Sequence, residues 1–253
     1  MDLTGKTIAI TGAAQGIGRA LALAFADAHS GLALIDLGSE RLQESCELVR
    51  QRGGTARAYV ANVADEVQVE AAADAIVADF GRFDGIINNA GILRDAMLLK
   101  AKEGSIVGRM TLEQWRAVID VNLTGVFLCG RAAAERMVKL GNGGVIVNIS
   151  SISRHGNAGQ SNYSAAKAGV VALAEVWSKE LSRFGIRTGS IAPGFVRTDI
   201  LSSMKPEVLE RVLAPVPLKR LGEPAEIAGA ARFIFENEFF TGRCIDLDGG
   251  LRF

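Results

Sequence analysis

Tyr163 and Lys167 are the two residues whose types and spacing most directly suggest chemistry. They lie four apart in a proline-free, alanine-rich segment, Tyr163–Leu181, whose composition predicts a helix, so both side chains leave one face of it. A phenol with a reference pKa of about 10 is a poor acid or base at neutral pH. An ammonium within ~4 Å, at an effective dielectric of about 20, favours the phenolate by up to roughly 4 kcal/mol. The pair therefore predicts a tyrosine that can transfer a proton.

A serine hydroxyl is the third group of this predicted site. The apolar run Val145–Ile149 predicts a strand that ends at Ser150 and Ser151, where a hydroxyl can hold a carbonyl oxygen beside the phenol while a proton moves. Taken alone, a tyrosine and a lysine four apart are better explained as a solvated helix face. The rest of the chain reverses that preference.

A glycine-rich turn near the N-terminus predicts a dinucleotide site. The apolar run Thr7–Thr11 predicts a strand, and Gly12, Gly16 and Gly18 follow it before a helical pattern over Arg19–Ala28. The first glycine permits a tight turn, the second lets backbone amides approach a pyrophosphate, and the third allows close packing of helix on strand. An ordinary strand-to-helix connection is the alternative, and the flanking pattern disfavours it.

Asp36 ends the next predicted strand, Leu32–Ile35, where a carboxylate would accept hydrogen bonds from the ribose hydroxyls of an adenosine. It would also repel a 2′-phosphate. No arginine or lysine stands in the glycine turn, where Gln15 sits, or in Leu37–Ser39 directly after the aspartate. We therefore expect NAD as the cofactor, with NADP less favoured. The alternative role for Asp36 is to cap a helix predicted over Ser39–Arg52, although the serine that opens this helix is better placed.

Strand and helix patterns alternate along the rest of the chain. Further strands are predicted over Ala56–Val60, Gly85–Ile87, Ile186–Ile191 and Cys244–Leu247, and further helices over Asp65–Phe80, Thr111–Leu140 and Pro224–Phe235. Repeated strand–helix units imply an α/β fold with a parallel sheet covered on both faces. Two irregular segments, Ile92–Arg109 and the partly helical stretch between Pro193 and Pro217, follow strand ends, where open α/β sheets bind ligands.

Composition narrows the class of protein. The 253 residues are 49% hydrophobic, enough for one large core, so a single domain over residues 1–253 is the simplest expectation. Lys+Arg and Asp+Glu are each 28, with no basic stripe for nucleic acid or an anionic membrane, which favours a small-molecule partner. The N-terminus lacks signal-peptide features and no apolar run approaches the ~20 residues that span a bilayer, so we expect a cytoplasmic protein. Three dispersed cysteines and two histidines predict reduced thiols and no metal site.

Together these residues closely resemble the short-chain dehydrogenase/reductase family, over essentially the whole chain. The matching motifs are Thr11–Gly18, Asn88–Gly91, Asn122, the serine, Tyr163, Lys167, Pro193–Gly194 and Asp246–Gly250. The resemblance implies a single-domain Rossmann fold with seven parallel strands and helices on both faces. It also implies a homotetramer and hydride transfer between a nicotinamide and a carbonyl or secondary alcohol.

The resemblance implies roles for single residues. Tyr163 would be the acid/base, Lys167 would lower its pKa and bind the nicotinamide ribose, and Ser151 would orient the substrate oxygen. Asn122 would hold a water that links Lys167 to solvent, with an interhelical hydrogen bond as its structural alternative. Residues implied around the cofactor are Gly12, Gln15, Gly16, Ile17, Gly18, Asp36, Asn62, Val63, Asn89, Ala90, Gly91, Tyr163, Lys167, Pro193, Gly194, Val196 and Thr198.

Three positions depart from the family pattern. The loop from the serine to Tyr163 is one residue shorter than usual, so counting back from Tyr163 indicates Ser150, whereas the strand end indicates Ser151. We expect Ser151, because the strand is the rigid reference and a loop absorbs a deletion. Asn62 replaces the usual aspartate near adenine, and its amide oxygen can still accept from the adenine amine. The segment Lys100–Arg109 is an insertion relative to the shortest members.

Two motifs, Gly156–Tyr163 and Gly194–Asp199, are most similar to the beta-ketoacyl-acyl-carrier-protein reductases, which usually use NADPH. The leading hypothesis is thus an NAD(P)-dependent oxidoreductase, with NAD(H) preferred and a 3-oxoacyl thioester as a candidate substrate. Alternatives are a dehydrogenase of a cyclic alcohol, steroid or sugar, or a non-catalytic nucleotide sensor, although a sensor has no need of the serine, tyrosine and lysine. An epimerase or dehydratase on this fold would need a longer carboxyl-terminal domain.

Overall fold

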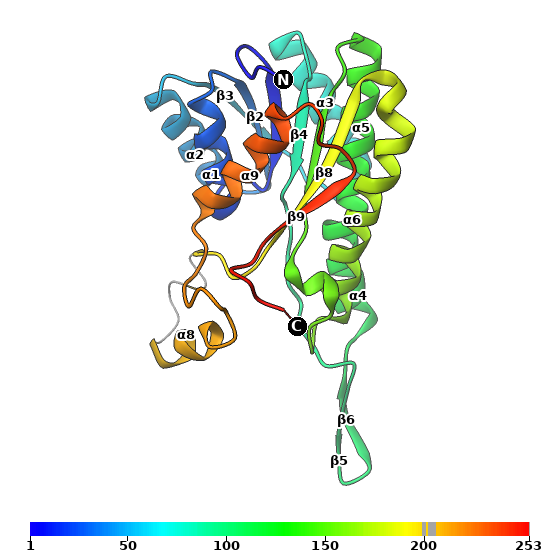
Figure 1. Cartoon of the computed structure of the whole chain (residues 1–253). Coiled ribbons are helices and arrows are strands. Elements are labelled where there is room, and N and C mark those ends of the chain that lie inside the picture. Colours follow the sequence, from blue (N-terminus) through cyan, green and yellow to red (C-terminus); the bar gives the residue numbers. More distant parts are fainter. Residues whose placement is uncertain (199–200, 202–205, 253) are drawn as a thin grey trace.

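The computed structural model describes residues 1–198, 201 and 206–252, and a seven-stranded parallel sheet forms its centre (Figure 1). The strand order is β3-β2-β1-β4-β7-β8-β9. The strands are β1 (Thr7–Thr11), β2 (Gly31–Asp36), β3 (Thr55–Val60), β4 (Gly85–Asn88), β7 (Gly144–Ile149), β8 (Ile186–Pro193) and β9 (Arg243–Leu247). Because the order reverses between β1 and β4, their carboxyl ends open a crevice, where doubly wound sheets bind ligands. The expected Rossmann fold is confirmed.

Helices cover both faces of the sheet. One face carries α1 (Gly16–Ala26), α2 (Ser39–Gln51) and α9 (Pro224–Glu236), and the other carries α3 (Glu66–Phe80), α5 (Gly125–Leu140) and α6 (Ser161–Leu181) (Figure 1). Each layer buries its own apolar cluster against the sheet. Phe25 of α1 meets Phe235 of α9 edge to face, with ring centroids 5.0 Å apart, in the first cluster. These layers fix the carboxyl ends of the strands, where the site lies.

The helix predicted over Thr111–Leu140 is continuous but irregular. Thr111 forms a capping box with Gln114, α4 spans Leu112–Ile119, and a π-helical turn over Asp120–Thr124 leads into α5. By length and composition this stretch could cross a membrane, which differs from the expectation that no apolar run approaches that length. However, 56% of its most apolar 18-residue window is buried inside the fold, as in the core helix of a globular protein.

The two irregular segments contain regular structure. In the first, β5 (Leu99–Lys102) and β6 (Ser105–Arg109) form an antiparallel hairpin that projects away from the sheet (Figure 1). Glu103 and Gly104 turn it with φ of 51° and 79°, both left-handed, as a tight hairpin turn requires. The expectation of an irregular loop was wrong here. The second segment contains α8 (Pro206–Leu213), whereas its residues 199–200 and 202–205 lie outside the described residues.

Candidate active site

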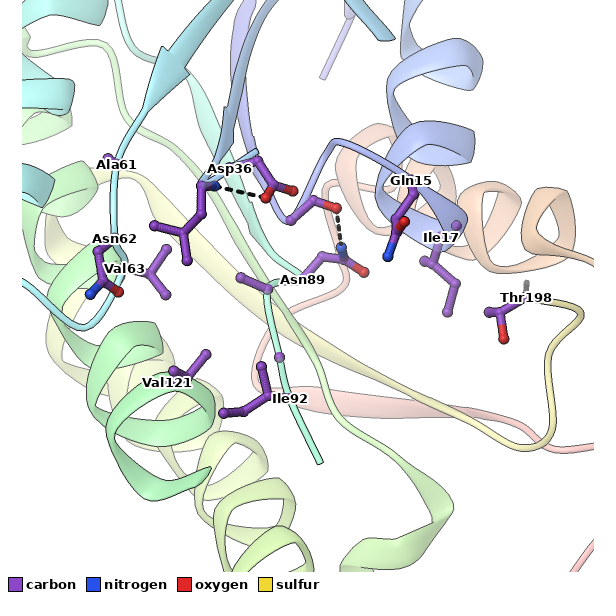
Figure 2. Close-up of a pocket in the computed structure, with 15 residues that line it drawn as sticks. Gln15, Ile17, Asp36, Ala61, Asn62, Val63, Asn89, Ile92, Val121 and Thr198 are labelled. Atoms are coloured by element: carbon purple, nitrogen blue, oxygen red, sulfur yellow. Dashed lines mark hydrogen bonds between the residues drawn. The ribbon is translucent and has the colours of Figure 1, made fainter. Parts of the chain in front are cut away.

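A cavity of about 380 Å³ opens at the carboxyl ends of β1, β2 and β4 (Figure 2). Its lining includes 11 of the 17 residues expected around the cofactor: Gly12, Gln15, Gly16, Ile17, Asp36, Asn62, Val63, Asn89, Ala90, Gly91 and Thr198. In Figure 2, Asn62 and Thr198 lie at opposite ends of it. Sequence reasoning missed Leu37, Ala61, Ile92 and Val121, which also line it. These four have apolar side chains and carry no motif of their own.

The glycine turn is shaped by close backbone contacts. Gly12 has φ of 66°, and a Cβ there would lie 2.9 Å from the Cα of Ala90. A Cβ on Gly18 would lie 2.0 Å from the carbonyl oxygen of Gly12, which explains why Gly18 packs the turn instead of lining the cavity. Asn89 fixes the same turn, because its Nδ2 donates to the Thr11 carbonyl at 3.0 Å and to the Gly12 carbonyl at 3.1 Å. Figure 2 shows the second of these bonds.

Helix α1 begins at Gly16, three residues before the predicted start, with its N-terminus at the cavity. Gln15 is its N-cap residue and makes no side-chain capping hydrogen bond, so the amides of the first turn are left for a ligand. The positive end of the helix dipole favours an anion there. An uncapped helix N-terminus behind a glycine turn fits the pyrophosphate of a dinucleotide.

Asp36 lies at the edge of this cavity with both carboxylate oxygens held by backbone amides. Its Oδ2 accepts from the Ala14 amide at 3.0 Å and its Oδ1 from the Leu37 amide at 2.7 Å. The predicted helix-cap role is not seen, since the N-cap residue of α2 is Gly38 and makes no side-chain cap. Sequence reasoning also missed Arg41, whose guanidinium donates to the Gln15 side chain from the first turns of α2. A cation thus stands near the glycine turn, although none stands in it.

The serine, tyrosine and lysine meet at the end of β7 and the start of α6. The Ser151 side chain lies close enough to the Tyr163 hydroxyl to lower its pKa, and the Ser151 Oγ accepts from the Ser153 amide at 3.1 Å. Ser150 points elsewhere, into the protein, where its Oγ donates to the Lys167 carbonyl at 2.7 Å. Lys167 is 3% exposed, and its Nζ donates to the Ile149 carbonyl at 2.8 Å. Of the two serines, Ser151 is therefore the one beside the phenol.

The electrostatics of this group differ from the expectation. Burial raises the pKa of Tyr163, the hydrogen bond from Ser151 lowers it, and the charge of Asp95 raises it. The expected lowering of this pKa by Lys167 is not seen, since the ammonium lies 5.5 Å from the Tyr163 ring centroid and is bound to a carbonyl. Burial in turn lowers the pKa of Lys167 to about 8. Ser151 is thus the group that eases ionisation of the phenol in this structure.

Asn122 ties the π-helical turn to the segment after β4, and Asn162 ties α6 to its neighbours. Asn122 is fully buried in the π-helical turn, where its side chain accepts from the Ile92 amide at 2.8 Å and donates to the Ile92 carbonyl at 3.0 Å. It therefore binds the strand-end segment, in place of the interhelical bond considered above. Asn162 donates to the Arg94 and Gln114 carbonyls and accepts from the Tyr163 amide. π-turns occur often at functional sites.

Other expected residues lie away from the cavity. Pro193 ends β8, Val196 is 5% exposed in the core, and neither Gly194 nor the serine group lines the 380 Å³ space. Among the residues that the structure describes, no group of three histidine, cysteine or acidic side chains could hold a metal ion.

Comparison with known proteins identifies relatives of the whole chain. The family model described as enoyl-(acyl carrier protein) reductase matches residues 12–252. The 3-oxoacyl-(acyl-carrier-protein) reductase FabG of Thermotoga maritima is 40% identical and covers 99% of both chains, and the Synechocystis enzyme is 40% identical over 98% of each. The solved structure of levodione reductase is similar with a TM-score of 0.88, at 34% identity over 98% of both chains. A short-chain type dehydrogenase/reductase from Mycobacterium marinum has a TM-score of 0.87, at 32% identity over 98% of this chain and 96% of that one.

Fold, site and relatives define a nicotinamide-dependent oxidoreductase that acts on CH–OH or keto groups. The chain belongs to the short-chain dehydrogenase/reductase family.

Proposed function

We propose that this protein reduces the keto group of a 3-oxoacyl thioester with NADH, and that residues 1–253 form one domain for both cofactor binding and catalysis. The observation that carries the catalytic part is the Ser151 side chain placed beside the Tyr163 hydroxyl, whose pKa it lowers, with Lys167 buried one helical turn away. The substrate class is supported by the 3-oxoacyl-(acyl-carrier-protein) reductases that match the whole chain.

The proposed mechanism divides the reduction between cofactor and protein. When bound, the nicotinamide supplies a hydride to the keto carbon. Tyr163 donates its phenolic proton to the substrate oxygen, and Ser151 donates a hydrogen bond to the same oxygen as negative charge develops there. Lys167, with a pKa of about 8, holds a proton that can replace the one lost by the phenol near neutral pH. Asn122 would support a water on the path from Lys167 to solvent.

The preference for NAD(H) is supported by Asp36. Its carboxylate is held at the cavity edge by the Ala14 amide at 3.0 Å, so it cannot swing away from a ligand without losing that bond. A 2′-phosphate would meet a fixed negative charge, whereas ribose hydroxyls can donate to it. Arg41, held on Gln15, is the cation that would reduce the penalty for NADP.

Assembly as a homotetramer and a cytoplasmic location complete the proposal. Large apolar side chains are exposed on three elements of the outer surface: Phe127 at 40% on α5, Val176 at 45% on α6 and Phe233 at 47% on α9. Exposed apolar side chains of this size are common in protein–protein interfaces, so these helices are candidate contact surfaces between subunits. Light scattering of the purified protein would measure the assembly.

A substrate panel tests the function. We would compare kcat/KM for a 3-oxoacyl thioester, a free cyclic diketone and a keto sugar with NADH, using Tyr163→Phe as the inactive control. A thioester favoured by at least about tenfold, or ~1.4 kcal/mol, supports the proposal. A second candidate, reduction of a free dione, is favoured by the 34% identity to levodione reductase, and a better rate with the diketone would select it. NADH binding without turnover of any compound would indicate a nucleotide sensor.

A further inference from the structure

The turn that follows Ser151 is anchored to the last strand of the sheet by one partly buried arginine. Arg154 lies in the short 3-10 helix η2 (Ile152–His155), and its side chain is 13% exposed. Its Nη2 lies 2.8 Å from the Oδ1 of Asp246, and its Nη1 donates to the Sγ of Cys244. Both partners belong to β9, so the guanidinium bridges two segments far apart in the sequence.

The spacing of the two partners matches the fork of an arginine. Cys244 and Asp246 are two residues apart on a strand, so their side chains leave the same face. Two guanidinium nitrogens can reach both at once, whereas a lysine ammonium can reach only one. The remaining donor, Nε, lies 3.2 Å from the Nε2 of His155. The charge on Asp246 is shared with Arg252, which approaches its Oδ2 at 3.7 Å from solvent.

The anchored turn holds the serine through both of its oxygen atoms. The Arg154 amide donates to the Ser151 carbonyl at 3.1 Å, and the Ser153 amide donates to the Ser151 Oγ at 3.1 Å. On the other side, β9 pairs with β8 and β8 with β7, the strand that leads into Ser151. Ser151 is therefore held by the strand that precedes it and by the turn that follows it. Arg154 connects that turn back to β9 of the same sheet.

We propose that Arg154 is a positioning residue: by clamping the turn η2 to β9, it holds the Ser151 hydroxyl against that of Tyr163. The inference rests on the proposed roles of Ser151 and Tyr163. It goes beyond them because it attributes the exact position of the Ser151 hydroxyl to a contact made outside the cofactor cavity. A shift of about 1 Å in a reacting group can cost on the order of 10²-fold in rate.

Kinetics of four variants test this positioning. Arg154→Ala should lower kcat by about ten- to hundredfold, with KM and the dissociation constant for NADH changed less than about threefold, because a donor to the substrate oxygen is displaced. Arg154→Lys should recover part of the loss, and Asp246→Asn should show a smaller loss. Arg252→Ala is the matched control, since it removes the solvent-side cation from the same carboxylate, and its kcat should stay within about twofold of wild type.

A double-mutant cycle separates positioning from general damage. If Arg154 acts through the serine hydroxyl, Arg154→Ala should cost almost nothing further in a Ser151→Ala background. Equal losses in the two backgrounds, or an Arg154→Ala enzyme with wild-type kcat, would overturn the inference.

Hydrogen exchange gives a readout that does not depend on turnover. Amides of residues 151–156 should exchange faster in Arg154→Ala than in wild type or Arg252→Ala, while those of α6 stay protected. Unchanged exchange in this turn would overturn the clamp. A wild-type protein that reduces no keto compound would instead overturn the proposed function, and the exchange result would still decide whether Arg154 holds the turn.

Discussion

The Ser150 hydroxyl donates a 2.7 Å hydrogen bond to the carbonyl of Lys167, inside the protein. Its neighbour Ser151 faces Tyr163 instead, as alternation along an extended chain requires. We therefore predict that Ser151→Ala lowers kcat by about 10²- to 10³-fold, the usual cost of one lost donor to a developing oxyanion. Ser150→Ala should change mainly the free energy of unfolding, because it leaves a buried carbonyl with one partner fewer. The reverse pattern in steady-state kinetics would reassign the serine.

Tyr163→Phe should abolish turnover and keep cofactor binding. The change removes the proton donor and almost no volume, so the cofactor cavity keeps its shape. Lys167→Ala should lower turnover and weaken cofactor binding, because it also removes the buried ammonium that binds the Ile149 carbonyl. Fluorescence titration with NADH and a sensitive rate assay measure the two effects separately. Near-normal rates for Tyr163→Phe on a good substrate would show that another group supplies the proton.

NADH should bind at least about tenfold tighter than NADPH, a difference of ~1.4 kcal/mol. Asp36→Ala should narrow the gap by removing the fixed charge at the cavity edge. Arg41→Ala should weaken NADPH binding more than NADH binding, since both cofactors carry a pyrophosphate but only NADPH carries a 2′-phosphate for its guanidinium. Calorimetric titration of both cofactors into the three proteins provides the comparison. Equal dissociation constants in the wild-type protein would contradict the assignment.

Two substitutions should move the pH profile in opposite directions. In alcohol oxidation the phenolate of Tyr163 is the base, so kcat rises with pH through its pKa. Asp95→Asn removes a charge that raises this pKa, and the rising limb should move to lower pH. Ser151→Ala removes a hydrogen bond that lowers the pKa, and the limb should move to higher pH. Shifts of the same sign would exclude Tyr163 as the titrating group.

Lys167 should make stability depend on pH in the alkaline range. Its pKa is about 8 in the folded protein against 10.5 for an ordinary lysine, so between these values the unfolded chain binds a proton that the folded chain does not. The free energy of unfolding therefore gains a contribution that rises with pH from about 8 to 10.5 and reaches roughly 3 kcal/mol at most. Urea titrations at several pH values measure the free energy of unfolding of wild type and Lys167→Met. The difference between the two proteins should change as the pH rises from about 8 to 10.5. Parallel pH curves would show that the lysine keeps an ordinary pKa.

Much of the fold follows from local patterns. The run Val145–Ile149 is fully buried in β7, as an apolar segment bounded by glycines and serines predicts, and β1 and β4 are fully buried as well. The hairpin β5–β6 was missed because a turn centred on Glu103 lacks the usual Asn-Gly or Asp-Gly signal. The early start of α1 at Gly16 was missed because glycine has poor helix propensity, which the tertiary contact of Gly18 with Gly12 overrides.

The sequence predicted the parts of the site that depend on residue type. It did not predict the parts that depend on distances between elements packed together in the fold. Tyr163, Lys167 and Ser151 come together as their spacing suggests, but the position of the ammonium on the Ile149 carbonyl depends on packing. The guanidinium of Arg41 reaches Gln15 only because α2 runs beside the glycine turn, which no local pattern encodes. Contacts that cross between elements need the fold before they can be named.

The β5–β6 hairpin is a suitable site for inserting a tag into this protein. Strands β5 and β6 pair with each other, and the residues of both strands and of the turn between them are exposed apart from the partly covered Gly108. A short affinity peptide or a fluorophore-bearing loop inserted between Glu103 and Gly104 would extend from the tip of an arm that already stands clear of the sheet (Figure 1). The molecule could then be attached to a support through that arm, with its sheet and helices free of the tether.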